Sequence, residues 1–195
     1  ETGDWLLSID TEFGHGINHV DGKLRCIQFC WAPGKAAFVK LTDTKGDWVF
    51  DCAPAILAEV LQKFLNNPRR KFIGHYVATD LTWLHYHFGI DWYGRTAMDT
   101  GYALHCICET ADMKLERLSM RYTDLGRYDI ALLLAKKKLK IGDKDGYICI
   151  PDDVLVPYAC KDVDVCKRLY PIFFKELLRQ GFNIQLAVDY LGVSR

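Results

Sequence analysis

An apolar run that ends in two acidic residues, Asp10 and Glu12, constrains the fold of this chain more than any other feature. The run begins at Trp5 and predicts a buried β-strand over residues 5–9. Side chains alternate between the two faces of an extended strand, so Asp10 and Glu12 point to the same side. Two carboxylates on one face repel each other, and a hard divalent cation such as Mg²⁺ or Mn²⁺ relieves the repulsion because it prefers oxygen ligands. The alternative is a pair of solvated loop acids, which is what an isolated Asp-x-Glu usually is.

The first half of the chain alternates apolar runs with turn signals. Asp21-Gly22 and Pro33-Gly34 are turn dipeptides, and the short connections that they imply favour an antiparallel meander of three strands. A helical stripe with Pro54 in its first turn follows, and then a short apolar strand. The predicted strands span residues 5–9, 24–31, 36–41 and 71–74. This order of elements is typical of an α/β fold.

The second half of the chain is mostly helical. Pro151-Asp152-Asp153 predicts the start of a long helix, because acidic side chains suit the amino-terminal end of the helix dipole. The predicted helices span residues 53–65, 80–88, 97–108, 114–122, 127–138, 152–180 and 183–191. No internal repeat or low-complexity linker interrupts the sequence, so we expect residues 1–195 to form a single domain, with residues 1–3 a remnant of cloning or processing.

Composition limits the classes of function. The formal net charge is zero, which argues against a broad surface that grips duplex DNA but allows a small site whose positive charge comes from bound metal. None of the eight cysteines forms a Cys-x-x-Cys pair, and most lie among apolar neighbours. We therefore expect buried free thiols in a reducing compartment.

The sequence contains no run of 18 apolar residues and no signal-peptide pattern. We expect an intracellular protein that acts as a monomer, in the cytoplasm of a bacterial or phage-infected cell.

Two further acids stand where the sequence pattern makes them informative. Asp80 follows the strand at 71–74 and begins a helix, where its ordinary role is that of an amino-terminal cap. Asp162 lies four residues after Tyr158 on the apolar, inward face of the long helix. A carboxylate on such a face is costly unless it is paired or metal-bound. Asp164 falls on another face and is expected to be solvated.

Taken together, these segments resemble the three motifs of the DEDD 3′–5′ exonucleases. The first is Asp10-Thr11-Glu12, the second the Gly74–Leu84 segment with Asp80, and the third Tyr158-x-x-x-Asp162. The tyrosine four residues before the last aspartate is similar to the subgroup found in the proofreading domains of family A DNA polymerases. The stretch between the second and third motifs also fits, so the resemblance covers about residues 4–180.

The resemblance implies an RNase H-like α/β fold, with a mixed sheet of about five strands flanked by helices. It implies that Asp10, Glu12 and Asp162 hold one divalent metal ion, Mg²⁺ or Mn²⁺, and that Asp10 and Asp80 help to position a second. Tyr158 is implied to orient the attacking water and to help remove its proton, although a tyrosine with its usual pKa of about 10 is a poor base unless the metals acidify the water. The products implied are 5′-nucleoside monophosphates released from a 3′ end.

Two departures from the family pattern concern the substrate. The second motif usually has an asparagine four residues before its aspartate, and here that position is Tyr76; a lysine often found two before it is Ala78. Tyr76 is therefore a candidate substrate contact, and Thr11, which lies between the first two acids, is another. Phe13 and Ile17 are candidates to pack against the terminal base, because base–aromatic stacking is common in single-strand binding. For Phe13 the alternative is a place in the core.

The leading hypothesis is a metal-dependent 3′–5′ exonuclease that acts on the 3′ end of single-stranded DNA and is attached to a polymerase domain in the full-length protein. A second hypothesis is a stand-alone exonuclease of the same superfamily that acts on RNA or DNA. A third is a catalytically inactive nucleic-acid-binding module. The presence of all four acids and of Tyr158 argues against the third.

Overall fold

The computed structural model describes residues 5–16, 18–142 and 145–182. Its strands are β1 (Trp5–Gly14), β2 (Lys23–Ala32), β3 (Lys35–Lys40), β4 (Arg70–Gly74) and β5 (Thr96–Asp99). Its helices are α1 (Pro54–Leu65), α2 (Ala78–Phe88), α3 (Thr100–Ile107), α4 (Leu115–Tyr122), α5 (Ile130–Leu139) and α6 (Asp152–Arg179).

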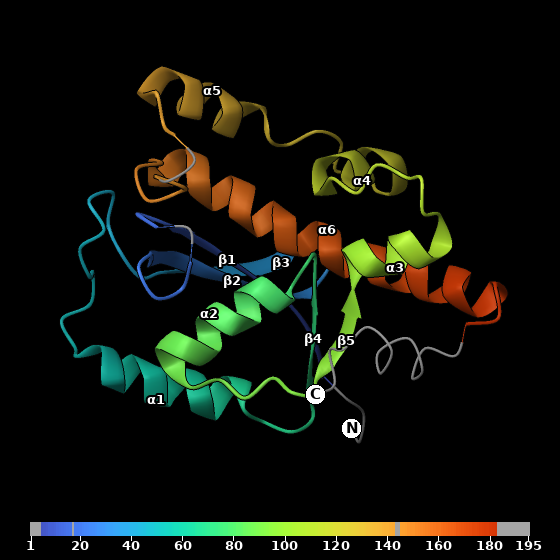
Figure 1. The fold of residues 1–195 in the computed structure, drawn as a ribbon, viewed down its shortest axis with the longest axis horizontal. Coiled ribbons are helices and arrows are strands. Elements are labelled where there is room, and N and C mark those ends of the chain that lie inside the picture. The colour runs from blue at the N-terminus through green and yellow to red at the C-terminus, as the bar shows by residue number, and fades with distance from the viewer. Residues whose placement is uncertain (1–4, 17, 143–144, 183–195) are drawn as a thin grey trace.

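The strands form one mixed sheet in the order β3-β2-β1-β4-β5. The pairs β1–β2 and β2–β3 are antiparallel, as the turn dipeptides predict, whereas β1–β4 and β4–β5 are parallel. Helices α1 and α2 lie on one side of the sheet and the long helix α6 crosses the other side (Figure 1). The predicted fold class, a mixed sheet of about five strands flanked by helices, is confirmed.

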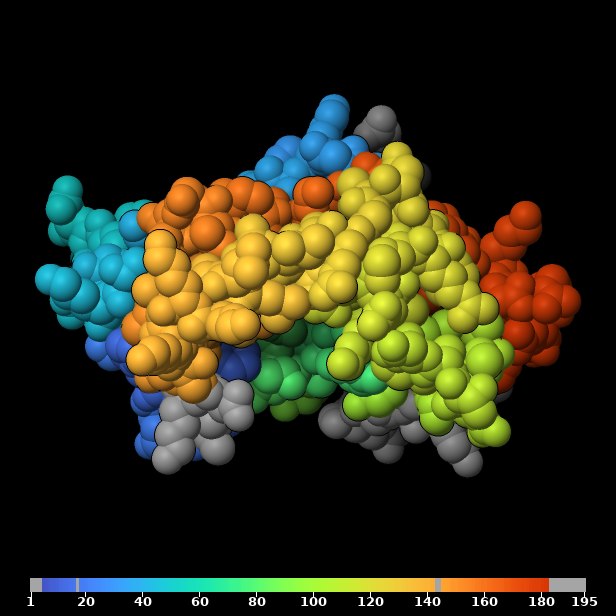
Figure 2. Space-filling view, turned by 90° about the horizontal axis from the view of Figure 1, so that it is seen from above, coloured from blue at the N-terminus to red at the C-terminus, as the bar shows by residue number. Residues whose placement is uncertain are grey.

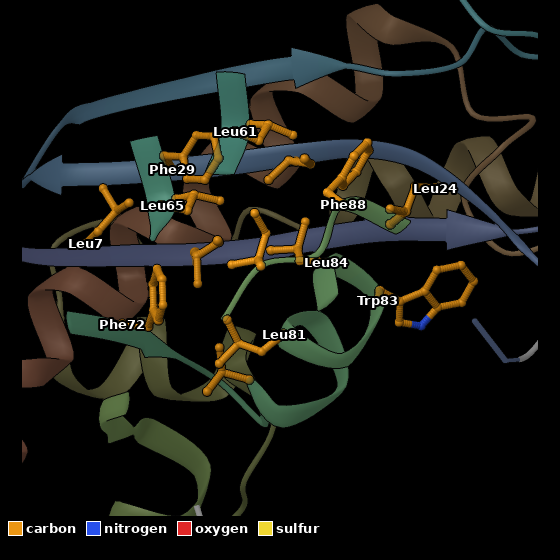
Figure 3. Close-up of a cluster of buried hydrophobic side chains, with 14 of the residues drawn as sticks. Leu7, Leu24, Phe29, Leu61, Leu65, Phe72, Leu81, Trp83, Leu84 and Phe88 are labelled. Carbon is orange, nitrogen blue, oxygen red and sulfur yellow. The ribbon is translucent and has the colours of Figure 1, made fainter. Parts of the chain in front are cut away.

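The main core fills the space between the sheet and the pair α1–α2. Leu7 and Phe29 from the sheet meet Leu61 and Leu65 of α1, and Leu81 and Leu84 come from α2, as Figure 3 shows. Burial of each such side chain contributes about 1.5–3 kcal/mol. This core fixes α2 against the end of β1, and so it determines where Asp80 stands.

A buried arginine attaches the start of α6 to the sheet. Between Glu12 and Phe13 the register of β1 with β2 shifts, so that Arg25 of β2 is the extra residue of a β-bulge. The Arg25 guanidinium is fully buried and donates hydrogen bonds to the carbonyl oxygen of Thr42 and to the carboxylate of Asp152. Lys40 Nζ lies 2.6 Å from the other oxygen of Asp152. The amino terminus of α6 is therefore held by two cations from neighbouring strands.

Two of the predicted elements need correction. The predicted helix over 97–108 is wrong at its start, because Thr96–Asp99 is strand β5 and α3 begins only at Thr100. The parallel pairing with β4 decides this segment, and no local periodicity reports that pairing. The first strand also continues past residue 9 to Gly14, since β2 pairs with it along that length. The acid pair therefore lies within the strand.

The expectation that Asp164 is solvated is also wrong. Its side chain is buried beneath the β2–β3 turn, where Asp164 Oδ1 accepts hydrogen bonds from the Gly34 N–H at 2.9 Å and from Arg168 Nε at 3.1 Å. Helix α6 runs without interruption through Pro171. The predicted helix over 183–191 and residues 1–3 lie outside the described residues.

All eight cysteines are free thiols, but the expectation that they are buried holds only for Cys26, Cys30 and Cys166. Cys108 is exposed, and the other four are intermediate. Over the described part of the chain, no helix is both long enough and apolar enough to cross a membrane.

Candidate active site

The central strand β1 presents Asp10 and Glu12 to helix α6, and it presents Thr11, which lies between them, to helix α2. Asp10 and Glu12 share a side of β1 with Asp162 of α6, and each of the three offers a carboxylate oxygen within 4.8 Å of the other two. Thr11 points to the opposite side, toward α2. This division follows from the alternation of side chains along a strand.

Asp80 lies in the first turn of α2 and joins the site through Thr11. The N–H and the hydroxyl of Thr11 both donate to Asp80 Oδ1, at 2.9 Å and 2.6 Å. The amino-terminal cap of α2 is Val77, so the interpretation of Asp80 as an ordinary cap residue is wrong. Asp80 is buried, and it lines the same cavity as Asp10, Glu12 and Asp162.

Asp10 and Asp162 also accept a hydrogen bond from an uncharged side chain. Gln28 stands opposite Asp10 in β2, and its Nε2 donates to Asp10 Oδ2 at 2.8 Å. The Tyr128 hydroxyl, just before α5, donates to Asp162 Oδ1. Neutral donors orient a carboxylate without cancelling its charge, so the site retains its attraction for cations.

Burial, and after it the charge of neighbouring acids, raises the pKa values of the four acids. Burial, followed by the charges of Asp80 and Glu12, raises the pKa of Asp10. Burial and then the charge of Asp162 raise the pKa of Glu12. Burial raises the pKa of Asp80 and of Asp162 to about 7, although hydrogen bonds from neighbouring hydroxyl groups act in the opposite direction. Without a bound cation, the protein therefore disfavours the state in which all four acids are ionised.

A cavity of about 610 Å³ contains the acids. Figure 2 shows this face of the molecule as a hollow beneath the yellow α4–α5 segment, with green residues of the β4–α2 segment recessed inside it. Besides the acids, the lining includes aromatic and polar residues: Thr11, Phe13, His75, Tyr76, Thr79, Lys114, Glu116, Tyr147 and Tyr158. An open cavity lined by acids and aromatic rings suits a flexible polymer end.

The predicted substrate contacts have different surroundings. The Phe13 ring stacks on Trp83 at 4.3 Å between centroids, so this side chain is partly in the core while it also lines the cavity. Tyr76 lines the cavity and is exposed. The Thr11 hydroxyl donates its hydrogen bond to Asp80. Ile17 lies outside the described residues. Their contacts with substrate stay predictions.

Tyr158 is buried on α6 within a group of tyrosines. Its ring is stacked with that of Tyr147 at 6.1 Å and tilted to that of Tyr128 at 5.7 Å. Burial, followed by the charges of Asp162 and Glu12, raises the pKa of Tyr158 well above its usual value. Its hydroxyl is therefore a neutral hydrogen-bonding group.

Among the residues that contact the acids or Tyr158, the sequence did not predict Gln28, Tyr128 and Tyr147. Gln28 carried a signal, because a glutamine between the apolar residues Ile27 and Phe29 in a buried strand needs a polar partner. Tyr128 and Tyr147 lie in connections between helices, where nothing in the local pattern indicates that they turn toward the acids.

The donor set fits a hard divalent cation. All ligand atoms that the cluster offers are carboxylate oxygens, which Mg²⁺ and Mn²⁺ prefer. Bound positive charge also favours the ionised form of these acids, which burial and their mutual repulsion disfavour.

Comparison with known proteins agrees with this chemistry. Residues 4–178 match the sequence model of a protein family described as 3′–5′ exonuclease. The DNA polymerase of Escherichia phage T5 is 31% identical over an alignment of 151 residues, and the alignment covers 72% of this chain. The match spans only 18% of that polymerase.

Solved structures show the same fold at lower identity. NrnC of Brucella melitensis superposes with a TM-score of 0.69 at 19% identity, covering 98% of this chain and 82% of NrnC. Further NrnC structures contain Mg²⁺ or pGG. The catalytic core of RRP6 from Trypanosoma brucei gives a TM-score of 0.66 at 16% identity, covering 98% of this chain and 46% of that one. The fold is RNase H-like, and the chain belongs to the 3′–5′ exonuclease family related to polymerase proofreading domains.

Proposed function

We propose that this domain removes nucleotides from the 3′ end of single-stranded DNA and releases 5′-nucleoside monophosphates, as the proofreading part of a family A DNA polymerase. The observation that carries the proposal is the cluster of four acids, three of them buried, in a cavity that aromatic side chains also line. The similarity to a phage DNA polymerase supports DNA as the substrate.

The cofactors proposed are two divalent ions, Mg²⁺ or Mn²⁺. Asp10, Glu12 and Asp162 would hold one, and Asp10 and Asp80 would help to hold the other. When bound, such ions lower the pKa of a water nucleophile and stabilise the attacking and leaving oxygens. The Mg²⁺-containing structure of NrnC, which has the same fold, supports this assignment.

The protein contributes position and hydrogen bonding. Gln28 and Thr11 fix Asp10 and Asp80, while Tyr128 fixes Asp162. The Tyr158 hydroxyl, four residues before Asp162, orients the attacking water. Burial raises the pKa of Tyr158, so in the metal-free protein its hydroxyl keeps its proton and serves as a hydrogen-bonding group.

A stand-alone exonuclease that degrades RNA or short oligonucleotides is the second candidate function. It is favoured by the structure of NrnC with pGG, since this chain covers 82% of a protein of that fold. The two functions share the site and the reaction. They differ in the sugar that the cavity accepts and in whether a polymerase domain belongs to the same protein.

The first prediction tests the reaction. Single-stranded DNA labelled at its 5′ end should be shortened stepwise from the 3′ end in Mg²⁺ or Mn²⁺, and a chelator should stop the reaction. The double variant Asp10→Ala, Glu12→Ala should lose this activity and should melt no lower than the wild type, because it relieves carboxylate repulsion. Gel electrophoresis of the products and thermal melting measure the two effects.

Full activity in the double variant would show that the site is assigned wrongly. A wild-type protein that shortens no substrate in either metal would remove the catalytic proposal. The same assay with an RNA of identical sequence separates the two candidates, because a clear preference for RNA contradicts the proofreading role. The sequence of the full-length gene then shows whether a polymerase domain follows Arg195.

A further inference from the structure

Tyr76 stands at the edge of the catalytic cavity in a backbone conformation that a tyrosine rarely adopts. Its φ angle is 55°, in the left-handed region that side chains other than glycine avoid. Its side chain lines the cavity and remains 42% exposed. A strained residue persists only where its surroundings impose its conformation, so the contacts around Tyr76 are informative.

A single buried carboxylate, that of Asp99, holds this conformation. Asp99 Oδ1 accepts the N–H of Tyr76 at 3.0 Å, and Asp99 Oδ2 accepts the N–H of Val77 at 2.8 Å. Asp99 also caps α3, because it accepts the N–H groups of Gly101 and Tyr102 at 2.9 Å and 3.2 Å. The loop before α2 and the first turn of α3 are thus joined as one unit.

The ring of Tyr76 is packed as firmly as its backbone. It lies against Gly101, where an added Cβ would come within 2.9 Å of Tyr76 Cε1 and Cζ. The Tyr102 ring meets it edge-on, with centroids 5.6 Å apart and planes at 89°, and the His75 ring lies 4.7 Å away. The ring is therefore fixed before any substrate arrives, although much of it faces the opening.

We propose that Tyr76 is a preformed stacking surface for one unpaired nucleobase near the 3′ end of the substrate. The proposal rests on the proposed nuclease function and assigns part of its substrate recognition. An aromatic ring offers a flat face that every base can stack on, so this contact is tolerant of sequence. An asparagine at this position would instead offer hydrogen bonds. Because the ring is already ordered, stacking on it costs little additional side-chain entropy.

The test uses 5′-fluorescein oligothymidylate and two copies that carry an abasic site at the last or the penultimate nucleotide. Fluorescence anisotropy in chelator measures the dissociation constant, and KM is measured in Mg²⁺. Tyr76→Ala should bind the intact oligonucleotide about 5- to 150-fold more weakly, the range expected for one base–aromatic stack. It should bind one of the abasic copies as the wild type does. Tyr76→Phe should behave as the wild type.

A second variant moves the ring without removing it. Gly101→Ala places a methyl group where the Tyr76 ring now lies, so the ring must shift and binding should weaken as in Tyr76→Ala. Tyr93→Ala is the matched control, because Tyr93 is 54% exposed and packs on Trp92 outside the cavity lining. Thermal melting establishes that each variant is folded.

The proposal is overturned if Tyr76→Ala weakens binding of intact and both abasic oligonucleotides equally, or leaves all of them unchanged. Wild-type protein that binds the oligonucleotide in neither buffer also overturns it. Failure of the proposed function looks different: binding would still depend on Tyr76 and on the base, but no product would form in Mg²⁺ or Mn²⁺.

Discussion

Three acids in the site each accept a hydrogen bond from a neutral side chain of a neighbouring element. These pairs are Asp10 with Gln28, Asp80 with Thr11, and Asp162 with Tyr128. Each donor uses a single carboxylate oxygen. A donor of this kind selects one rotamer of the acid and so reduces the reorganisation that cation binding requires.

Removal of one donor should therefore weaken metal binding more than it weakens the fold. For Tyr128→Phe we expect the affinity for Mn²⁺ to fall by about 10- to 100-fold, the usual effect of losing a residue that orients a metal ligand. Isothermal titration calorimetry at constant pH measures the affinity. Tyr170→Phe is the control, because Tyr170 packs on Phe174 away from the acids. Equal affinities in the two variants would contradict the role of Tyr128.

Single residues of the site differ in how far the sequence predicts them. The alternation of a strand is enough to place Asp10 and Glu12 on one side. The donors Gln28 and Tyr128 lie 18 and 34 residues from their partners, so their contacts depend on strand register and on the path of a loop. Neither is visible in local periodicity.

At the scale of elements, the site depends on where α6 lies across the sheet. This helix carries Tyr158 and Asp162 in its first half. Its amino terminus is held by Arg25 and Lys40 through Asp152, and further along Lys167 Nζ donates to the carbonyl oxygen of Leu6 at 2.6 Å. These contacts determine which helical face meets β1.

Loss of the acidic group at the start of α6 should destabilise the protein. Asp152→Ala leaves the buried guanidinium of Arg25 without its carboxylate, at a cost of about 1.5–3 kcal/mol in the free energy of unfolding. Asp153→Ala is the matched control, because it removes an exposed acid from the same helical turn. Urea denaturation compares them. A loss of similar size in both variants would mean that only the helix dipole is involved.

The predicted elements failed where pairing overrides local pattern. The start of α6 was predictable because acids after Pro151 mark a helix amino terminus. Strand β5 has only four residues, and it forms because it pairs in parallel with β4, a strand that is distant in the sequence. Asp99 did carry a signal for the start of α3, since aspartate is a favoured amino-terminal cap.

At the scale of the whole molecule, folding gathers acids that are separated in the unfolded chain. Burial raises the pKa of Asp162 from 3.8 to about 7. Between these pH values the folded protein binds a proton that the unfolded chain has released. The contribution of Asp162 to the free energy of unfolding therefore decreases as pH rises through this window and is lost above about pH 7.

Comparison with Asp162→Asn isolates this effect. In chelator, we expect the variant to gain stability relative to the wild type when pH is raised from about 5 to about 8. Burial lowers the pKa values of His75 and His87, which produces the opposite trend below pH 6.5, but both proteins share it. Urea denaturation at each pH measures the difference, and a difference independent of pH would contradict the linkage.

Divalent metal should reverse the trend in the wild type. Mg²⁺ or Mn²⁺ binds only the deprotonated acids, so its stabilisation should be larger at pH 8 than at pH 5.

The alternation along β1 also determines which kinds of genetic change the domain can survive. A substitution in β1 alters one side chain, whereas the loss or gain of one codon before Asp10 turns every later side chain to the opposite face of the sheet. The carboxylates would then enter the apolar layer beneath α1 and α2, and Thr11 would face Asp162. A lineage can drift through this strand residue by residue, but it cannot change the strand's length.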